Sequence, residues 1–196
     1  MRTPVKLGRE TALIVVDVQN DFCPGGALAV KEGDTVVPVF NRYLELSRKS
    51  GIRVFACRDW HPRNHRSFKA QGGPWPPHCV QETRGAEFHP DLKLPAEAVI
   101  ISKGWRPEDE SYSAFENTNL ELYLKRGGIR RVLVGGLATD YCVKQTALDA
   151  CRLGFETCFL TDASRGIDVK KGDSERALEE MKKAGAVPIT LKNITQ

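Results

Sequence analysis

The sequence has no long apolar run. No stretch approaches the roughly 20 residues that a membrane-spanning helix needs. The first residues lack the apolar core of a secretory signal peptide. Six cysteines are present, but they do not form the compact framework that stabilises small secreted domains. These absences predict a cytoplasmic protein with free thiols and no membrane partner.

A strong excess of one charge is also missing. The formal net charge is +4, from 29 basic and 25 acidic residues. Basic residues come in scattered pairs such as Lys125-Arg126 and Lys182-Lys183, whereas a nucleic-acid-binding face needs a concentrated stripe. We therefore expect no nucleic-acid partner. No internal repeat or linker divides the 196 residues, so the sequence predicts a single domain, 1–196.

Apolar strands alternate with amphipathic helices along the chain. We expect strands at residues 11–16, 52–57, 98–102, 131–134, 157–161 and 186–191. Helices are expected at 35–49, at 117–126, between Cys142 and Gly154, and from Asp173 or Ser174 to Gly185. Strands that are apolar throughout and separated by helices indicate a parallel sheet covered on both faces. The predicted fold is therefore a Rossmann-like, three-layer α/β/α protein with a six-stranded parallel sheet.

One long segment interrupts this alternation, an insertion at about 59–97. Its frequent prolines and glycines leave no sustained period, and such loops are usually either functional or disordered. Aromatic residues such as Trp60 and Phe68 would let it pack, which favours a folded insertion. All four histidines of the chain lie in it: His61, His65, His78 and His89.

Chemically useful side chains stand where predicted strands end. Asp17, Asp59, Lys103 and Cys142 each follow a strand, at the edge where open α/β sheets bind ligands. Each alone has an ordinary interpretation, such as a capping carboxylate, a solvent-facing lysine or a small core thiol. Together they would bring a nucleophile, carboxylates and a cation to one edge. Cys142 would lie where a strand meets a helix, whose dipole favours the thiolate.

Five stretches carry a resemblance to a known family. They are residues 16–22 (VDVQNDF), 58–62 (RDWHP), 75–80 (WPPHCV), 101–104 (ISKG) and 136–143 (GLATDYCV). In these stretches the sequence resembles the isochorismatase-like cysteine hydrolases, and more narrowly their metal-containing nicotinamidase and pyrazinamidase branch. The resemblance covers essentially the whole chain. It implies the isochorismatase-like hydrolase fold and the hydrolysis of nicotinamide to nicotinate and ammonia in NAD salvage, with pyrazinamide as a further substrate.

The resemblance also implies the catalytic residues. Cys142 would be the nucleophile that forms a thioester, Asp17 the general base, and Lys103 the cation that stabilises the thiolate. The family places an oxyanion hole at the N–H groups of Ala138 and Cys142, with a cis peptide bond between Leu137 and Ala138. The resemblance further implies that Phe22 and Trp75 sandwich the pyridine ring, although both could be plain core aromatics.

A metal site is expected in the insertion. Asp59 and His61 are two residues apart, so both side chains point the same way in an extended segment, and His78 would complete the set. One divalent ion is expected, zinc first, with iron or manganese as alternatives. By the resemblance this ion holds the pyridine nitrogen. His65 is left open between a further ligand and a hydrogen-bonding role, and His89 is expected at the surface.

Three functions are left open by the residues. The first is a nicotinamidase, and the second is another hydrolase of the superfamily acting on isochorismate, a carbamoyl amine or a ureido compound. The expected metal set argues against the second. The third is a non-catalytic binding module, which would be expected to have lost Cys142, Asp17 or Lys103. The partner is a small molecule in the first two cases, and a homo-oligomer is neither required nor excluded.

Overall fold

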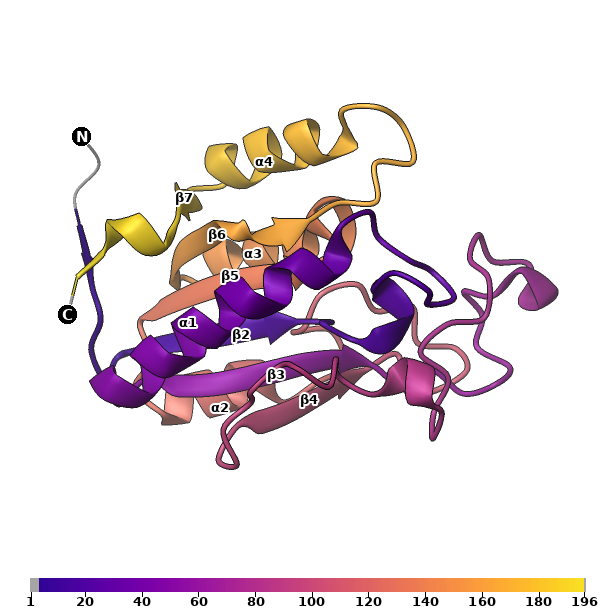
Figure 1. The fold of residues 1–196 in the computed structure, drawn as a ribbon, viewed down its shortest axis with the longest axis horizontal. Coiled ribbons are helices and arrows are strands. Elements are labelled where there is room, and N and C mark those ends of the chain that lie inside the picture. Colours follow the sequence, from indigo (N-terminus) through magenta and orange to yellow (C-terminus); the bar gives the residue numbers. More distant parts are fainter. Residues whose placement is uncertain (1–3, 196) are drawn as a thin grey trace.

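A six-stranded parallel sheet forms the centre of the computed structural model, which describes residues 4–195. Figure 1 shows its strands, which lie in the order β4-β3-β2-β5-β6-β7. Their bounds are β2 Thr11–Val16, β3 Arg53–Asp59, β4 Val99–Lys103, β5 Arg131–Leu137, β6 Glu156–Arg165 and β7 Val187–Ile189. All neighbouring strands pair in parallel, which confirms the predicted sheet. Residues 1–3 and 196 of the predicted domain 1–196 lie outside the described residues, and that domain boundary stays a prediction.

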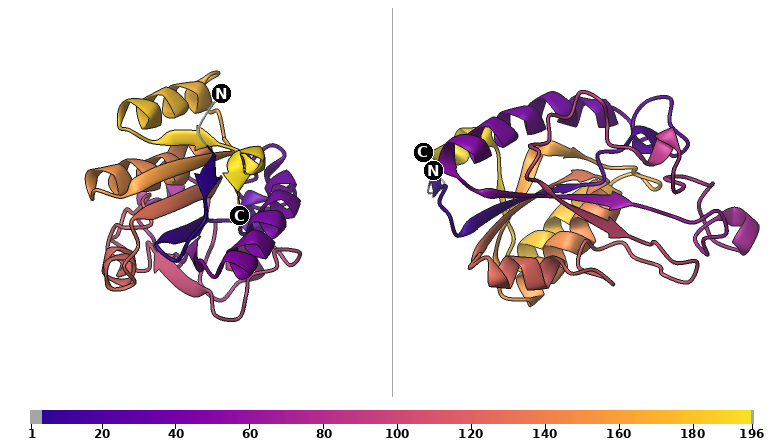
Figure 2. Two further views of the ribbon diagram at one scale, coloured as in Figure 1. Left: turned by 90° about the vertical axis from the view of Figure 1, so that its left-hand side faces the viewer. Right: turned by 90° about the horizontal axis from the view of Figure 1, so that it is seen from below.

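Helices cover both faces of the sheet (Figure 2). Helix α1 (Val36–Ser50) packs on one face, and α2 (Leu120–Arg126), α3 (Lys144–Arg152) and α4 (Asp173–Lys183) pack on the other. The central strand β2 is buried throughout, with Leu13 and Val15 in the core beneath α1 and Ile14 in the opposite core. This is the predicted three-layer arrangement. No helix among residues 4–195 is long and apolar enough to cross a membrane.

Two features of the fold were not predicted. A short parallel pair, β1 (Val5–Lys6) with β8 (Ile194–Thr195), joins the two ends of the described chain. Strands of two residues are too short to show a period in the sequence. Strands β5 and β6 also run further than expected, to Leu137 and Arg165, because Gly135-Gly136 and the polar end of β6 interrupt the apolar pattern.

The strand order brings the carboxyl ends of β2 and β5 to a switch point. From β2 the chain first adds β3 and β4 on one side, and then β5, β6 and β7 on the other. Ligands of open α/β sheets bind in the crevice at such a point, because the loops that leave the two strands diverge there. Asp17 follows β2, and Cys142 follows β5.

The insertion is folded against this edge of the sheet. It contains two short 3-10 helices, η3 (Lys69–Gln71) and η4 (Arg84–Ala86), and extends to the right in Figure 1. Its side chains Phe68, Cys79 and Ala86 are buried, and Cys79 and Ala86 belong to the core that α1 covers. Apolar packing therefore holds the segment in place, as its aromatic content predicted.

Candidate active site

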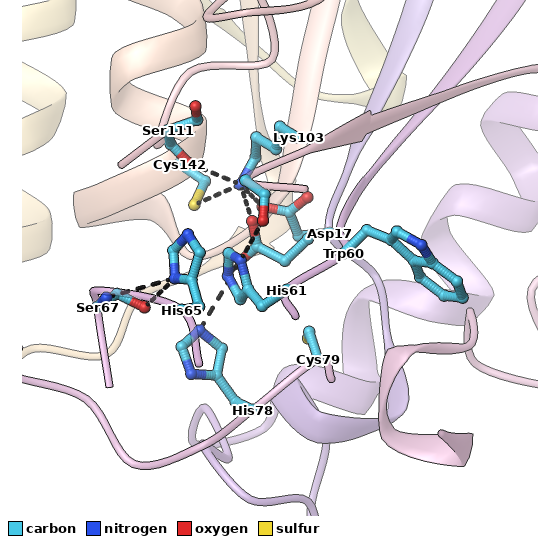
Figure 3. Close-up of polar contacts among 12 residues, drawn as sticks. Asp17, Trp60, His61, His65, Ser67, His78, Cys79, Lys103, Ser111 and Cys142 are labelled. Atoms are coloured by element: carbon cyan, nitrogen blue, oxygen red, sulfur yellow. Dashed lines mark hydrogen bonds and ion pairs between the residues drawn. The ribbon is translucent and has the colours of Figure 1, made fainter. Parts of the chain in front are cut away.

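Lys103 is the centre of a buried cluster at the switch point (Figure 3). Its Nζ lies 2.9 Å from Asp17 Oδ2 and 3.4 Å from Cys142 Sγ, and it also forms an ion pair with Asp59 Oδ1. These side chains come from four different segments of the chain. The structure thus brings together all four residues that the sequence placed at the strand ends.

The parallel sheet explains why these residues meet. Asp59 and Lys103 are the last residues of β3 and β4 and are direct partners in the register. Asp17 follows β2, and its N–H donates to Cys57 O over 3.0 Å. Asp17 has the left-handed φ of +51°, which turns the chain away from the strand direction.

Cys142 reaches the cluster from the other side of the switch point. It lies in a π-helical segment, η5 (Thr139–Val143), which leads into α3. Such single turns often occur at functional sites. A cis peptide bond joins Leu137 to Ala138 just before this segment, at the position that the family resemblance implies.

Buried charges set the protonation states of the cluster. Burial alone would lower the pKa of Lys103, but the carboxylates of Asp17 and Asp59 raise it well above its usual value. Burial alone would raise the pKa of Asp59, but Lys103 and His61 lower it below its usual range. Asp59 and Lys103 are therefore an ionised pair.

The thiol and its neighbouring carboxylate behave differently. Burial raises the pKa of Cys142 well above its usual value, although Lys103 acts against this shift. Burial also raises the pKa of Asp17 to about 6, again against Lys103. The helix end and Lys103 therefore do not by themselves make Cys142 a thiolate in the resting site, because the loss of solvation outweighs the local positive charge and the thiol needs a base. A thiol lies next to a carboxylate that is mostly ionised at neutral pH.

A second cluster shares Asp59 with the first. Asp59 Oδ2 lies 3.6 Å from His61 Nε2 and 4.0 Å from His78 Nε2. One ligand atom from each of the three residues lies within 4.8 Å of the others, and all three residues are buried. Asp59 therefore presents one oxygen to Lys103 and the other to the two imidazoles.

Backbone carbonyls fix the tautomers of both histidines. His61 Nδ1 donates to Gly104 O and His78 Nδ1 donates to Pro76 O, each over 2.8 Å. Each Nε2 therefore carries its lone pair and faces Asp59, as a metal ligand must. A Cβ on Gly104, whose φ is +59°, would lie 2.5 Å from His61 Cε1, so the close approach requires glycine there.

His65 lies against this cluster without a free nitrogen. Its ring stacks on His61 with centroids 4.0 Å apart. Its Nε2 donates to Asp109 O over 2.6 Å, and its Nδ1 accepts from the hydroxyl of Ser67 over 2.7 Å. Burial lowers the pKa of His65 to about 4, so the ring is neutral. This arrangement favours the hydrogen-bonding role over a further metal ligand.

A small cavity of about 30 Å³ opens onto Asp59, His61 and His78, which form the candidate metal cluster. Trp75 and Tyr112 line it, and Trp75 Nε1 donates to the Tyr112 hydroxyl over 3.0 Å. Trp75 also packs edge-on against Tyr141, with ring centroids 5.1 Å apart. Phe22 instead lies beside His78, with centroids 5.6 Å apart. His89 is half-buried, and its backbone N–H donates to Val18 O over 2.9 Å.

The sequence assigns no role to two residues that lie beside the site, Gln19 and Tyr112. Gln19 donates through Nε2 to Asp59 O over 2.8 Å and accepts from Asp59 N–H over 2.8 Å, so its side chain fixes the backbone of Asp59. Its position between Asp17 and Asp21 in a recognised stretch was the available signal. Tyr112 gave no signal, because it lies in an aperiodic stretch after β4.

The fold and the side chains at its switch point define the class of protein, an isochorismatase-like hydrolase. The sequence matches the family described as Isochorismatase domain over residues 11–193, so the chain belongs to this family.

Individual relatives narrow the comparison. The nicotinamidase of Escherichia coli (strain K12) is 45% identical, over 92% of this chain and 94% of that protein. The pyrazinamidase of Pyrococcus horikoshii, solved in complex with zinc, superposes with a TM-score of 0.89 at 53% identity, covering 93% of this chain and 99% of that one. The PnC1 protein of L. infantum, solved with nicotinate, gives a TM-score of 0.88 at 36% identity and covers 98% of each chain.

Proposed function

We propose that this chain is a nicotinamidase that hydrolyses nicotinamide to nicotinate and ammonia in NAD salvage. One observation carries the proposal: Asp59 joins the Lys103 cluster, with its thiol, to a pair of imidazoles in the same site. A substrate that fits both must combine a hydrolysable carbonyl with a metal-binding atom a few bonds away. Nicotinamide has both, and so does pyrazinamide. The names of the similar proteins support the same substrate class.

The donor set suits one divalent metal. A carboxylate oxygen and two imidazole Nε2 atoms, all with free lone pairs, match the ligands of zinc, with iron or manganese as alternatives. Asp59, His61 and His78 would hold the ion. When bound, it would supply a coordination position for the ring nitrogen of the substrate. Two protein nitrogens and one oxygen leave such positions open.

The first half of the reaction makes a thioester on Cys142. Asp17 accepts the thiol proton as Sγ attacks the carboxamide carbon, so the high pKa of the resting thiol does not prevent the reaction. Lys103 lies between the two groups and stabilises the thiolate as it forms. The C–N bond then breaks, and Asp17 returns the proton to the leaving nitrogen, which departs as ammonia.

The second half hydrolyses the thioester. A water molecule loses a proton to Asp17 and attacks the carbonyl carbon. The C–S bond breaks, Asp17 returns the proton to the sulfur of Cys142, and nicotinic acid leaves and releases its own proton to solvent as nicotinate. In both halves the developing oxyanion would be held by the N–H groups of Ala138 and Cys142, since backbone donors at such a turn are fixed before the charge appears.

The substrate ring would lie against the aromatic residues of the cavity. Trp75 lines the cavity and would contact the ring directly. Phe22 packs against His78 and would hold that imidazole in place beside the ring. All six cysteines are free, which suits the reducing cytoplasm. We assign the protein there.

Ammonia release from nicotinamide by the purified, zinc-loaded protein tests the proposal. Cys142→Ala should lower kcat/KM by roughly 10³-fold or more, because it removes the nucleophile. Cys142→Ser should lose nearly as much, since its hydroxyl is a far weaker acid. Cys151→Ala, which changes a half-buried cysteine on α3, is the matched control and should retain activity. Substantial turnover by Cys142→Ala would refute the thioester mechanism.

A further inference from the structure

Asp21 links the end of β2 to the loop that carries His78. It lies in the 3-10 helix η1 (Asn20–Phe22), four residues beyond Asp17. Its Oδ2 accepts a hydrogen bond from Cys79 N–H over 2.7 Å, and its Oδ1 accepts from Ala27 N–H over 3.1 Å. A carboxylate that accepts backbone N–H groups forms charge-assisted bonds, which are stronger than neutral ones.

The peptide groups of Cys79 stand between the two histidine ligands. Cys79 directly follows His78, and its carbonyl accepts from His61 N–H over 2.9 Å. Its φ of +45° is left-handed, a conformation that a residue other than glycine adopts only when its surroundings hold it. Asp21 supplies part of that hold, since it binds the N–H of this residue.

The backbone of Gly85 lies close to the same carboxylate, with no room for a side chain between them. A Cβ built on Gly85 would lie 2.1 Å from Asp21 Oδ2 and 2.5 Å from Oδ1. Any other residue at this position would displace the carboxylate. The Asp21 side chain is therefore confined between Gly85 and the Cys79 N–H, as a rigid support would be.

We propose that Asp21 is a positioning residue for the metal site, which it serves by fixing Cys79 and through it the orientation of His78. The inference rests on the metal site of the proposed function. Asp21 is not among the three residues whose ligand atoms converge, so it would act on the metal site only through the backbone. A residue that only stabilised the loop would change the stability of the fold and leave the affinity for the metal unaltered. A positioning residue changes the affinity for the metal.

The test is the zinc affinity of the full chain, measured by competition with a chromogenic chelator. Asp21→Ala should weaken zinc binding about 10–100-fold, the usual effect of losing a residue that orients a ligand. Asp21→Asn should fall between this variant and wild type, since its amide oxygen can still accept from Cys79 N–H. Asn20→Ala is the control. It removes a hydrogen bond from the same turn to Arg84 O, and we expect its zinc affinity to stay within about twofold of wild type.

Gly85→Ala provides an independent variant that keeps Asp21 but displaces its carboxylate. It should weaken zinc binding in the same direction. If Asp21→Ala does not fold, Asp21→Asn and Gly85→Ala carry the test. In the metal-free proteins, iodoacetamide should label Cys142 at wild-type rates, since the thiol cluster does not contact Asp21.

Two results would overturn the inference in different ways. Wild-type zinc affinity in Asp21→Ala, or in Gly85→Ala if Asp21→Ala does not fold, would show that Asp21 holds the loop without affecting the metal site. Absence of zinc binding by the wild-type protein would refute the proposed metal site itself, and the inference with it.

Discussion

At the scale of single residues, Lys103 neutralises two carboxylates that have lost their water. Removal of one member of a buried ion pair leaves an uncompensated charge and typically costs about 3–5 kcal/mol. We therefore expect Lys103→Met to lower the free energy of unfolding by about this amount at pH 7–8. Lys144→Met, which removes a half-exposed pair with Glu180, should cost less than about 1 kcal/mol.

The sign of the pH dependence follows from the pKa of Asp59. Lys103 holds this pKa below its usual range, so the stabilisation is present above the unfolded value near ~4 and is lost as the pH falls through the folded value. Wild type therefore keeps this stabilisation down to pH ~4, whereas in Lys103→Met the two carboxylates lack their cation and can protonate between pH 8 and pH 4, which relieves the buried charge. The gap in stability between the variant and wild type should therefore narrow from pH 8 to pH 4 in urea titrations. A constant gap would contradict the ion pair.

Asp17 sets a second pH dependence, that of the reaction. Burial raises its pKa to about 6, and only the ionised form can accept the thiol proton. The value of kcat/KM for nicotinamide should therefore fall about tenfold per pH unit below the pKa of Asp17. Asp17→Asn should remove this limb together with most of the activity, a loss of roughly 10²–10⁴-fold. A flat profile from pH 5 to 8 would show that Asp17 is not the base.

At the scale of elements, the insertion carries the two proposed histidine ligands, whereas the segments at the strand ends carry Asp17, Lys103 and Cys142, and Asp59 at the end of β3 belongs to both groups. Removal of the metal should therefore raise KM for nicotinamide far more than it slows alkylation of Cys142. His61→Ala and His78→Ala should behave like the stripped enzyme, because two ligands hold a divalent ion poorly. His65→Ala should lose only about 10–100-fold in affinity or activity, since its nitrogens bind Ser67 and Asp109.

Benzamide tests the same division of roles by a change in the substrate. It keeps the carboxamide but lacks the ring nitrogen, so it should be a poor substrate of the metal-loaded enzyme. Metal content and steady-state kinetics of the three histidine variants complete the measurement. Full occupancy in His78→Ala, or benzamide turned over as well as nicotinamide, would contradict the anchoring role of the metal.

The same division explains what the sequence could predict. The strands gave a clear signal because β2 and the core of β5 are continuous apolar runs, and their ends placed Asp17 and Cys142 at one edge. The insertion has no period, so its path could not be derived from a pattern. Spacing paired His61 with Asp59, and resemblance added His78, but the tautomers of both histidines depend on the carbonyls of Gly104 and Pro76, which come close only in the folded chain.

At the scale of the whole molecule, the depth of the site decides how the thiol is protonated. The sequence placed a helix end beside Cys142, which favours the thiolate, but the extent of burial depends on every element that closes over the site. Cys142 is only 6% exposed and Lys103 is fully buried, so desolvation dominates. Neighbours along the chain carry no information about such depth. The roles of Gln19 and Asp21 were missed for the same reason, since their partners lie 40 and 58 residues away.

The cavity beside the metal cluster has a kinetic consequence. The cavity is narrow, at about 30 Å³. A pyridine ring needs more room than this, and we predict that Trp75 and Tyr112 separate to admit the substrate and again to release the product. If this separation is slower than bond breaking, it sets the upper limit of kcat. In that regime the enzyme would slow in a more viscous solvent although no reacting group had changed.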